Sequence, residues 1–223
     1  MNKKLFGEAI AKFLLGVVLV GALIFVPAGT LRYPGGWLLM GVLFVPMFAA
    51  GLVMMVKSPQ LLRSRLKARE KRGEQSLVIK CSALMFLCAF VAAGLDFRFG
   101  WLPLPEWAPI AAAVVFLICY ALYAEVLREN VWLSRTVEVQ ENQQVVSTGL
   151  YGVVRHPMYA VTLWLFAAMP LVLGSVIGLI FLLPYPVLIA RRIRDEEQLL
   201  RAELPGYDEY CRKVRWRMIP WVW

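Results

Sequence analysis

The stretch TGLYGVVRHPMYAVTLW, residues 148–164, joins a polar connector to a run of apolar residues. Its centre holds the only histidine of the chain, His156, between Arg155 and Pro157. Proline suits the first turn of a helix, because its missing N–H would have no partner there. We therefore expect a membrane helix to begin at Pro157, with Arg155 and His156 at its positively polarised N-terminal end, where an anionic group can bind.

The composition around this stretch is that of a membrane protein. The 223 residues are 60% hydrophobic and 17% charged, and their mean hydropathy is +0.65. Such a chain is too apolar for the surface of a soluble globular protein. A membrane-spanning helix needs about 20 apolar residues. Four segments have this length: 10–29, 37–56, 77–95 and 107–127.

Two shorter apolar segments, 157–173 and 175–190, follow and meet at Gly174-Ser175. Pro170, Pro184 and Pro186 predict kinks or a tight hairpin here. We therefore predict an all-α fold: a polytopic integral membrane helical bundle of about six transmembrane segments, the last two forming a short hairpin.

The basic residues predict the orientation. If all six segments cross, 22 of the 24 Lys and Arg residues fall on one side, and Arg32 and Arg98 on the other. The positive-inside rule then places both termini and the 57–80 and 128–156 loops in the cytoplasm. The net charge of +9 is a topology signal; because it is spread over separate loops, it does not favour nucleic-acid binding. The first segment follows Lys3 and Lys4, but its length favours a retained helix over a signal peptide.

One integrated domain with two regions is expected. Residues 1–127 hold transmembrane helices 1–4 and the basic loop 57–80, and residues 128–223 hold the connector, the hairpin and a basic tail. In the loop, Leu61, Leu62 and Leu66 have helical spacing, which suits an interfacial helix on anionic lipid. Retention of positive charge explains the loop equally well. The cysteines lack CxxC spacing and no Cys/His cluster occurs, which argues against a zinc site.

A second charged motif follows the hairpin, in ARRIRDEEQLLRAELPGYDEYCRKVRWRMIPWVW, residues 190–223. Arg192 and Glu196 are one helical turn apart, with Arg194 and Glu197 beside them. Such pairs are usually solvated contacts on a helix surface. A hairpin, however, returns the chain to the side it left, so this motif and Arg155-His156 meet at one cytoplasmic face. Together they offer a positive pole for a carboxylate and a negative pole for an amine.

The two motifs also resemble a known family. GLYGVVRHPMY, then RRIRDEE, then GYDEYCRKVRWRMIP are similar to the isoprenylcysteine carboxyl methyltransferase family and the related membrane phospholipid methyltransferases, over roughly residues 130–220. The resemblance implies a multi-pass enzyme with its active site at the cytoplasmic face, S-adenosyl-L-methionine as cofactor and a lipophilic or prenylated substrate from the membrane. It implies these cofactor-binding residues: Gln143, Val145, Val146, Tyr151, Arg155, His156, Pro157, Met158, Tyr159, Glu196 and Glu197. Arg192, or Arg194 if the register shifts, is assigned to the substrate. Gln143 stands where the family often has histidine.

The chemistry leaves several functions open. A carboxylate acceptor is already a nucleophile, so methyl transfer to it needs positioning and desolvation more than a base. Arginine can orient such a carboxylate. An amine acceptor, as in phospholipid N-methylation, must lose a proton, for which His156, Glu196 or Glu197 is available. A membrane sterol-type reductase shares the C-terminal pattern. A transporter or scaffold is disfavoured because no inverted repeat is apparent, and Asp96 and Arg98 are expected in a short external loop.

Overall fold

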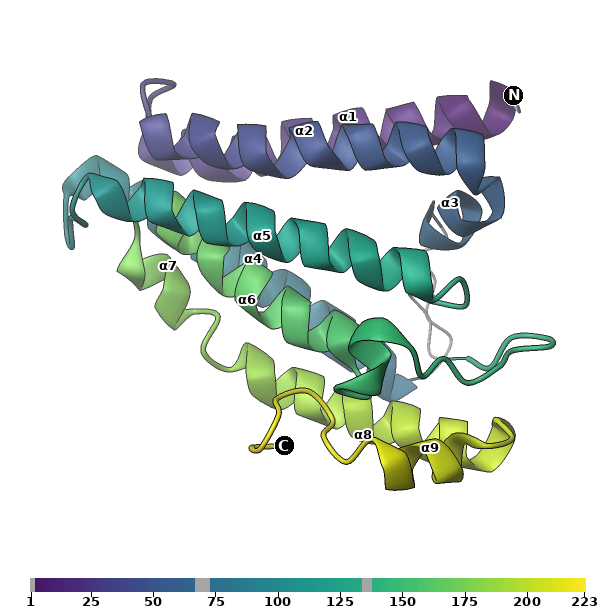
Figure 1. Cartoon of the computed structure of the whole chain (residues 1–223). Coiled ribbons are helices and arrows are strands. Elements are labelled where there is room, and N and C mark those ends of the chain that lie inside the picture. The colour runs from purple at the N-terminus through teal and green to yellow at the C-terminus, as the bar shows by residue number, and fades with distance from the viewer. Residues whose placement is uncertain (1–2, 67–72, 134–137) are drawn as a thin grey trace.

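The computed structural model describes residues 3–66, 73–133 and 138–223 (Figure 1). Regular structure in these ranges is helical, apart from an isolated bridge between Pro103 and Ser175. The elements in chain order are α1 (Lys3–Ala28), α2 (Pro34–Lys57), α3 (Pro59–Leu66), α4 (Gly73–Phe99), α5 (Trp107–Glu129), a 3₁₀ turn (Gly149–Gly152), α6 (Pro157–Val172), α7 (Val176–Ile180), α8 (Tyr185–Glu203) and α9 (Tyr207–Lys213).

Five segments in the described ranges are long and apolar enough to cross a membrane. They are Leu5–Ala28, Pro34–Lys57, Ser76–Phe99, Trp107–Glu129 and Val176–Glu203. Large apolar side chains on their outer faces are exposed, as lipid contact requires; Leu15 is 64% and Val26 74% exposed. The all-α, multi-pass character is thus confirmed. α6 is shorter, at 16 residues, and the number of crossings and the side of the termini remain predictions.

The hairpin differs from the expected pair of short helices. α6 ends at Val172, and Gly174 takes a positive φ of 79° in the turn that follows. The second arm then consists of two helices, because α7 stops at Ile180 and α8 begins at Tyr185. Pro184 and Pro186 have no N–H to donate, so a continuous helix cannot run through them without losing backbone bonds. α8 also continues to Glu203, which carries the Arg192–Glu197 motif on an ordered helix.

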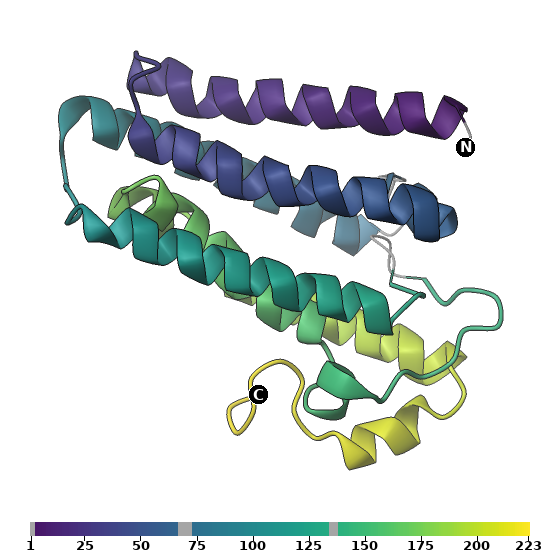
Figure 2. The same ribbon diagram turned by 45° about the horizontal axis from the view of Figure 1, so that its top comes forward.

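The helices run lengthwise beside one another in layers. α1 and α2 lie together over α4 and α5, α6 packs beneath α5, and α8 lies beyond α6 (Figures 1 and 2). The central core draws on α1, α2, α4, α5 and α6, and Ile24, Leu39, Phe116 and Val172 are fully buried in it. This packing fixes the start of α6 against the rest of the bundle.

Polar contacts close the end of the bundle where α6 turns into α7. The Ser175 hydroxyl donates to Asp96 (2.6 Å), and the backbone N–H of Leu102 donates to the other oxygen of the same carboxylate (3.0 Å). The Tyr33 hydroxyl donates to the carbonyl of Leu173 (2.5 Å). Asp96 is therefore a buried residue of α4, 3% exposed, and not a loop residue as expected. It anchors the turn that reverses the chain.

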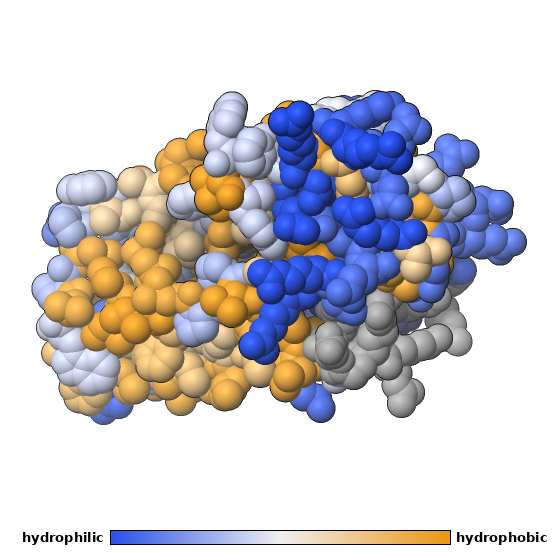
Figure 3. Space-filling model, turned by 90° about the horizontal axis from the view of Figure 1, so that it is seen from below, coloured by the Kyte–Doolittle hydropathy of each residue, from blue (hydrophilic) through white to orange (hydrophobic). Residues whose placement is uncertain are grey.

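Polar residues gather at the other end. The N-terminus, α3, the connector 138–156, the end of α8 and α9 all lie there (Figures 1 and 2), and one half of the face seen from below is hydrophilic (Figure 3). The helix expected within 57–80 forms as α3, and its Leu62 is buried, 5% exposed. Residues 67–72 of that loop lie outside the described residues.

Candidate active site

The start of α6 is held by the C-terminal tail. The backbone N–H of Arg155 donates to the carbonyl of Trp216 (2.9 Å), and that of His156 to the carbonyl of Arg217 (2.8 Å). Pro157 is the first residue of the helix, as predicted from its missing N–H. Residues far apart in the chain thus fix the backbone at Arg155-His156.

A buried ionic cluster ties α6, α8 and the tail together. The Glu197 carboxylate is 4% exposed and accepts hydrogen bonds from Arg155 Nε (2.7 Å) and Arg217 Nε (2.9 Å), one at each oxygen. His156 Nε2 lies 3.3 Å from the same carboxylate. Arg155 Nη1 donates to the carbonyls of Val214 and Arg215, at 2.9 Å each. Burying charges is costly unless they are paired in this way, so the cluster is a structural junction.

A second chain of contacts lies beside it. The Tyr159 hydroxyl donates to Glu196 Oε2 (2.6 Å) and accepts from Arg192 Nε (2.8 Å). His156 Nδ1 is 3.9 Å from Glu196 Oε1. The Glu196 side chain is 23% exposed, whereas Arg192 is buried. Tyr159 therefore links the cation and the carboxylate that the sequence placed one helical turn apart.

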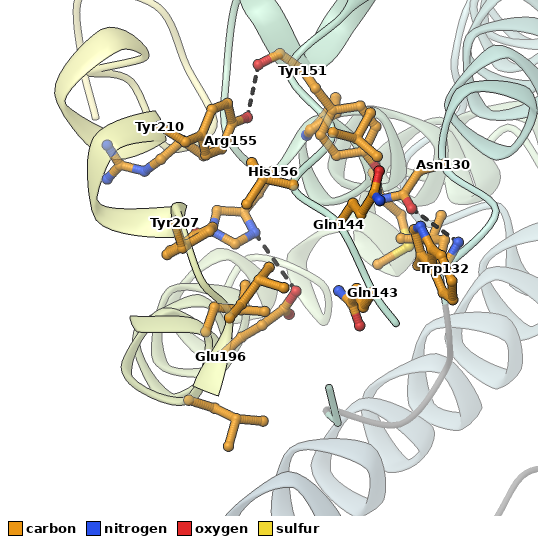
Figure 4. Close-up of a pocket in the computed structure, with 18 of the residues that line it drawn as sticks. Asn130, Trp132, Gln143, Gln144, Tyr151, Arg155, His156, Glu196, Tyr207 and Tyr210 are labelled. Carbon is orange, nitrogen blue, oxygen red and sulfur yellow. Dashed lines mark hydrogen bonds and ion pairs between the residues drawn. The ribbon is translucent and has the colours of Figure 1, made fainter. Parts of the chain in front are cut away.

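These groups border a cleft between the connector and the ends of α6, α8 and α9. Figure 4 shows Glu196, His156 and Tyr207 along one side of this cleft, and Gln143 and Trp132 along the other. Its unfilled space, including the opening to solvent, is about 830 Å³. Apolar walls come from Val145, Val146, Leu199, Leu200 and Leu204. The cleft thus combines apolar walls with a few polar groups.

One polar group of the cleft lacks a partner. The Tyr207 hydroxyl is buried and makes no hydrogen bond to any residue that the structure describes. Desolvation raises the pKa of Tyr207, with the neighbouring Glu197 carboxylate adding to the rise, so the hydroxyl is neutral and able to donate. Leaving a buried hydroxyl unpaired costs about 1–3 kcal/mol. A ligand in the cleft would remove that cost.

A second cavity, an apolar crevice, lies beside the cleft. It lies among α4, α5, α6 and α8, and Phe86, Phe166 and Ile189 give it apolar walls. Met158, Tyr159 and Arg192 line both this crevice and the polar cleft. The two cavities therefore meet at the Arg192–Tyr159 contact. In the described ranges, no group of three or more His, Cys, Asp and Glu side chains is placed to hold a metal ion.

Residues 109–202 match the isoprenylcysteine carboxyl methyltransferase (ICMT) family. This match confirms the resemblance predicted from the motifs. It begins in α5 and ends near the end of α8. The GYDEY segment that opens at Gly206, which also carried the resemblance, thus lies beyond the matched residues.

Three curated proteins are each similar to part of this chain. The Delta(14)-sterol reductase TM7SF2 of Mus musculus is 35% identical over 95 residues, which are 40% of this chain and 22% of that protein. The nickel-cobalt-cadmium resistance protein NccN of Alcaligenes xylosoxydans xylosoxydans is 31% identical over 90 residues, 38% of this chain and 40% of that protein. The cobalt-zinc-cadmium resistance protein CzcN of Cupriavidus metallidurans is 28% identical over a similar share. The matched region spans less than half of each relative.

The structure brings together most residues that the ICMT resemblance assigned to the site. These line the cleft: Gln143, Val145, Val146, Tyr151, Arg155, His156, Pro157, Met158, Tyr159, Arg192 and Glu196. The cofactor and substrate roles of these residues stay predictions. Gln143 Oε1 accepts from the backbone N–H of Gln140 (2.9 Å), so part of this side chain shapes its own turn.

Three expectations change. Arg194 is exposed and does not line the cleft in the described part of the chain, whereas Arg192 does. Glu197 is also absent from that lining, because the ionic cluster occupies its carboxylate. Arg155 borders the cleft, but its Nε and Nη1 atoms bind Glu197 and two tail carbonyls. The positive pole expected at Arg155 is therefore largely used within the protein.

Sequence reasoning missed several residues of the cleft: Asn130, Trp132, Leu133, Glu138, Gln144, Leu199, Leu200, Leu204, Tyr207 and Tyr210. Some of them brace the wall, since Tyr210 donates to the carbonyl of Tyr151 (2.7 Å) and Asn130 to its hydroxyl (3.0 Å). The paired tyrosines of GYDEY, three residues apart on one face of α9, were the available signal.

Proposed function

We propose that the chain is a membrane methyltransferase that uses S-adenosyl-L-methionine to methylate the carboxylate of a lipophilic, isoprenylcysteine-like acceptor. The observation that carries the proposal is the junction at Met158, Tyr159 and Arg192, where a polar cleft meets an apolar crevice. A water-soluble donor and a membrane-soluble acceptor need such a meeting point. The match of residues 109–202 to the ICMT family supports the reaction type.

The residues of the cleft fit this donor. Glu196 is one of two carboxylates that line the cleft, with Glu138, and would accept hydrogen bonds from the donor's ammonium. The unpaired Tyr207 hydroxyl would donate to its carboxylate or ribose. Val145, Val146 and Leu200 offer apolar contacts for the adenine. When bound, S-adenosyl-L-methionine supplies a methyl group made electrophilic by the positive charge on sulfur.

Arg192 would position the acceptor. Its guanidinium borders the crevice as well as the cleft, and arginine orients carboxylates through paired, charge-assisted hydrogen bonds. Tyr159 fixes the guanidinium through the 2.8 Å contact to Nε. Because a carboxylate needs no deprotonation, holding it in line and excluding water is the main task of the site.

An amine acceptor is the first alternative, because the site also holds groups that can take a proton. His156 and Glu196 both line the cleft, whereas the two oxygens of Glu197 are occupied by arginines. We favour the carboxylate acceptor because Arg192, a cation, lies where the acceptor's reacting group would arrive. An ammonium would be repelled there.

A reductase is the second candidate, favoured by the 35% identity to the Delta(14)-sterol reductase TM7SF2. The same cleft would then hold a reduced nicotinamide dinucleotide, which is larger and carries phosphates. Arginine side chains could bind these phosphates, but Arg155 and Arg217 near the cleft already bind Glu197. Binding of the dinucleotide is therefore less favourable. The two candidates therefore differ in the ligand that the cleft binds.

Two measurements, ligand binding and transfer of a labelled methyl group, distinguish these functions. Calorimetric titration of detergent-purified protein should detect S-adenosylhomocysteine and not the nicotinamide dinucleotide phosphate. Labelled methyl should pass from the donor to farnesylcysteine as a base-labile ester. A base-stable label would indicate an N-methylated amine instead. Binding of the dinucleotide alone would reject the methyltransferase proposal and favour the reductase.

A further inference from the structure

An apolar groove outside the proposed site lies between α5 and the N-terminal helices. Its unfilled space is about 1,380 Å³, including its opening. Residues of α1, α2, α3 and α5 line it: Ala9, Ile10, Lys12, Phe13, Met47, Phe48, Ala50, Gly51, Leu52, Met54, Met55, Leu62, Leu66, Tyr120, Tyr123, Ala124 and Leu127. Most of this lining precedes residue 109, where the family match begins.

One side chain borders both the groove and the apolar crevice beside the proposed site. Tyr123 of α5 lines the groove on one side and the apolar crevice on the other. The crevice in turn shares Met158, Tyr159 and Arg192 with the polar cleft. The groove and the crevice are therefore neighbours on either side of Tyr123, and Arg192 borders the crevice.

The lining suits a hydrocarbon chain. Met47, Met54 and Met55 present flexible thioethers that adapt to irregular apolar shapes. The charged group at the rim, Lys12, is bound to Glu8 (2.7 Å) and to the carbonyl of Leu66 (2.8 Å). At Gly51, an added Cβ would have no atom within 4 Å. The groove thus has free space and mostly apolar walls.

We propose that this groove holds the far end of the acceptor's hydrocarbon chain, while Arg192 holds its carboxylate. The inference rests on the proposed function for the identity of the acceptor. We commit to the acceptor, and not to a bulk lipid, because the groove shares Tyr123 with the crevice that Arg192 borders. The N-terminal helices would then select acceptors by chain length.

Photo-crosslinking tests the location without any methyl transfer. The probe is farnesylcysteine with a diazirine on its last isoprene unit, added to the whole protein with S-adenosylhomocysteine. Mass spectrometry should find label between Met47 and Met55 of α2, removed by excess farnesylcysteine and not by phosphatidylcholine.

Competed label confined to crevice residues of α4, α6 or α8 would overturn the inference alone. Absence of competed label anywhere would reject the proposed acceptor and the inference together. Groove label removed by phosphatidylcholine would show a bulk lipid site and overturn the inference.

A paired substitution tests the selectivity. Gly51→Leu fills the groove, and Gly41→Leu is its matched control, since Gly41 lies on the same helix, is exposed and also has no atom within 4 Å of an added Cβ. Each methylene kept from an apolar site weakens binding about fourfold, so displacing two or three should lower kcat/KM for a farnesyl acceptor at least about tenfold. For Gly51→Leu, transfer to a single-unit prenyl acceptor and affinity for S-adenosylhomocysteine should be unchanged. For Gly41→Leu, transfer to both acceptors should be unchanged. Equal loss for both chain lengths, or no loss, would contradict the proposal.

Discussion

The adjacent carboxylates of α8 have different surroundings, although the sequence presents them as one acidic pair. Successive helix residues point about 100° apart. Glu197 faces inward to Arg155 and Arg217, whereas Glu196 borders the cleft and accepts from Tyr159. One residue therefore contributes to folding and the other is available to a ligand.

Replacing each carboxylate by its amide should separate these roles. Glu196→Gln should lower S-adenosylhomocysteine affinity about ten- to hundredfold, because a charge-assisted hydrogen bond becomes neutral, with little change in thermal stability. Glu197→Gln should destabilise the fold by about 3–5 kcal/mol, since Arg155 loses its buried counter-ion. Calorimetry and thermal unfolding in detergent measure both effects.

Arg194→Ala serves as the control, because Arg194 is exposed on the same helix. It should alter neither affinity nor unfolding temperature. A well-folded Glu196→Gln protein with unchanged affinity would remove Glu196 from the ammonium site. A stable Glu197→Gln protein would argue that the ionic cluster contributes little to folding.

Tyr207→Phe offers a test in which stability and binding change in opposite directions. Removing the unpaired buried hydroxyl should leave the unfolding temperature of the empty protein unchanged or raised. Affinity for S-adenosylhomocysteine should fall about five- to tenfold, because one neutral hydrogen bond to the ligand is lost. Thermal shift with and without ligand measures both quantities.

Tyr210→Phe is the comparison, because the Tyr210 hydroxyl already donates to the carbonyl of Tyr151. Its loss should lower stability of the empty protein. If Tyr207→Phe lowered stability and kept full affinity, Tyr207 would be a packing residue with a partner formed in solution.

At the scale of the helices, close approach of backbones decides which elements pack. An added Cβ at Gly94 of α4 would lie 2.7 Å from the carbonyl oxygen of Ile24 and 3.1 Å from the N atom of Ala28, both in α1. Backbone atoms cannot move aside without separating the helices. The sequence predicted most helix ends to within a few residues, apart from the start of α1 and the arm formed by α7 and α8. No pattern within α4, however, identifies α1 as its neighbour.

Gly94→Ala should therefore destabilise the bundle by about 1–3 kcal/mol through overpacking. Gly41→Ala is the matched control on α2, where an added Cβ meets open space and should be neutral or slightly stabilising. Thermal unfolding in detergent compares the two. Equal unfolding temperatures would mean that α1 and α4 adjust at little cost.

For the whole molecule, the polar elements share one end of the bundle, where the candidate site also lies (Figures 1 and 3). Arg32 and Arg98 belong to the opposite end, near the junctions of α1 with α2 and of α4 with α5. This arrangement agrees with the charge-based topology.

Accessibility labelling tests that orientation. In a background without the four native cysteines, single cysteines at Arg32 or Arg98 should react with an impermeant maleimide in intact cells. Cysteines at Gln143 or Arg212 should react only after permeabilisation, because the excess of Lys and Arg keeps that end inside. External labelling at Gln143 would place the cleft away from the cytoplasmic donor and remove the basis of the proposed function.

The sequence by itself determined the medium, the helices and the residues of the two motifs, because hydropathy, proline position and helical spacing are local properties. His156 and Glu196 of the cleft were therefore identified from the motifs, and Tyr159 from the family resemblance. The tertiary structure decided the contacts of these residues and the course of the last helices. Glu197 is bound by Arg155 and Arg217, α7 and α8 are separate helices, and Tyr207 is left unpaired in the described chain. These depend on contacts between segments distant in sequence, whose distances and orientations are set only when the helices pack.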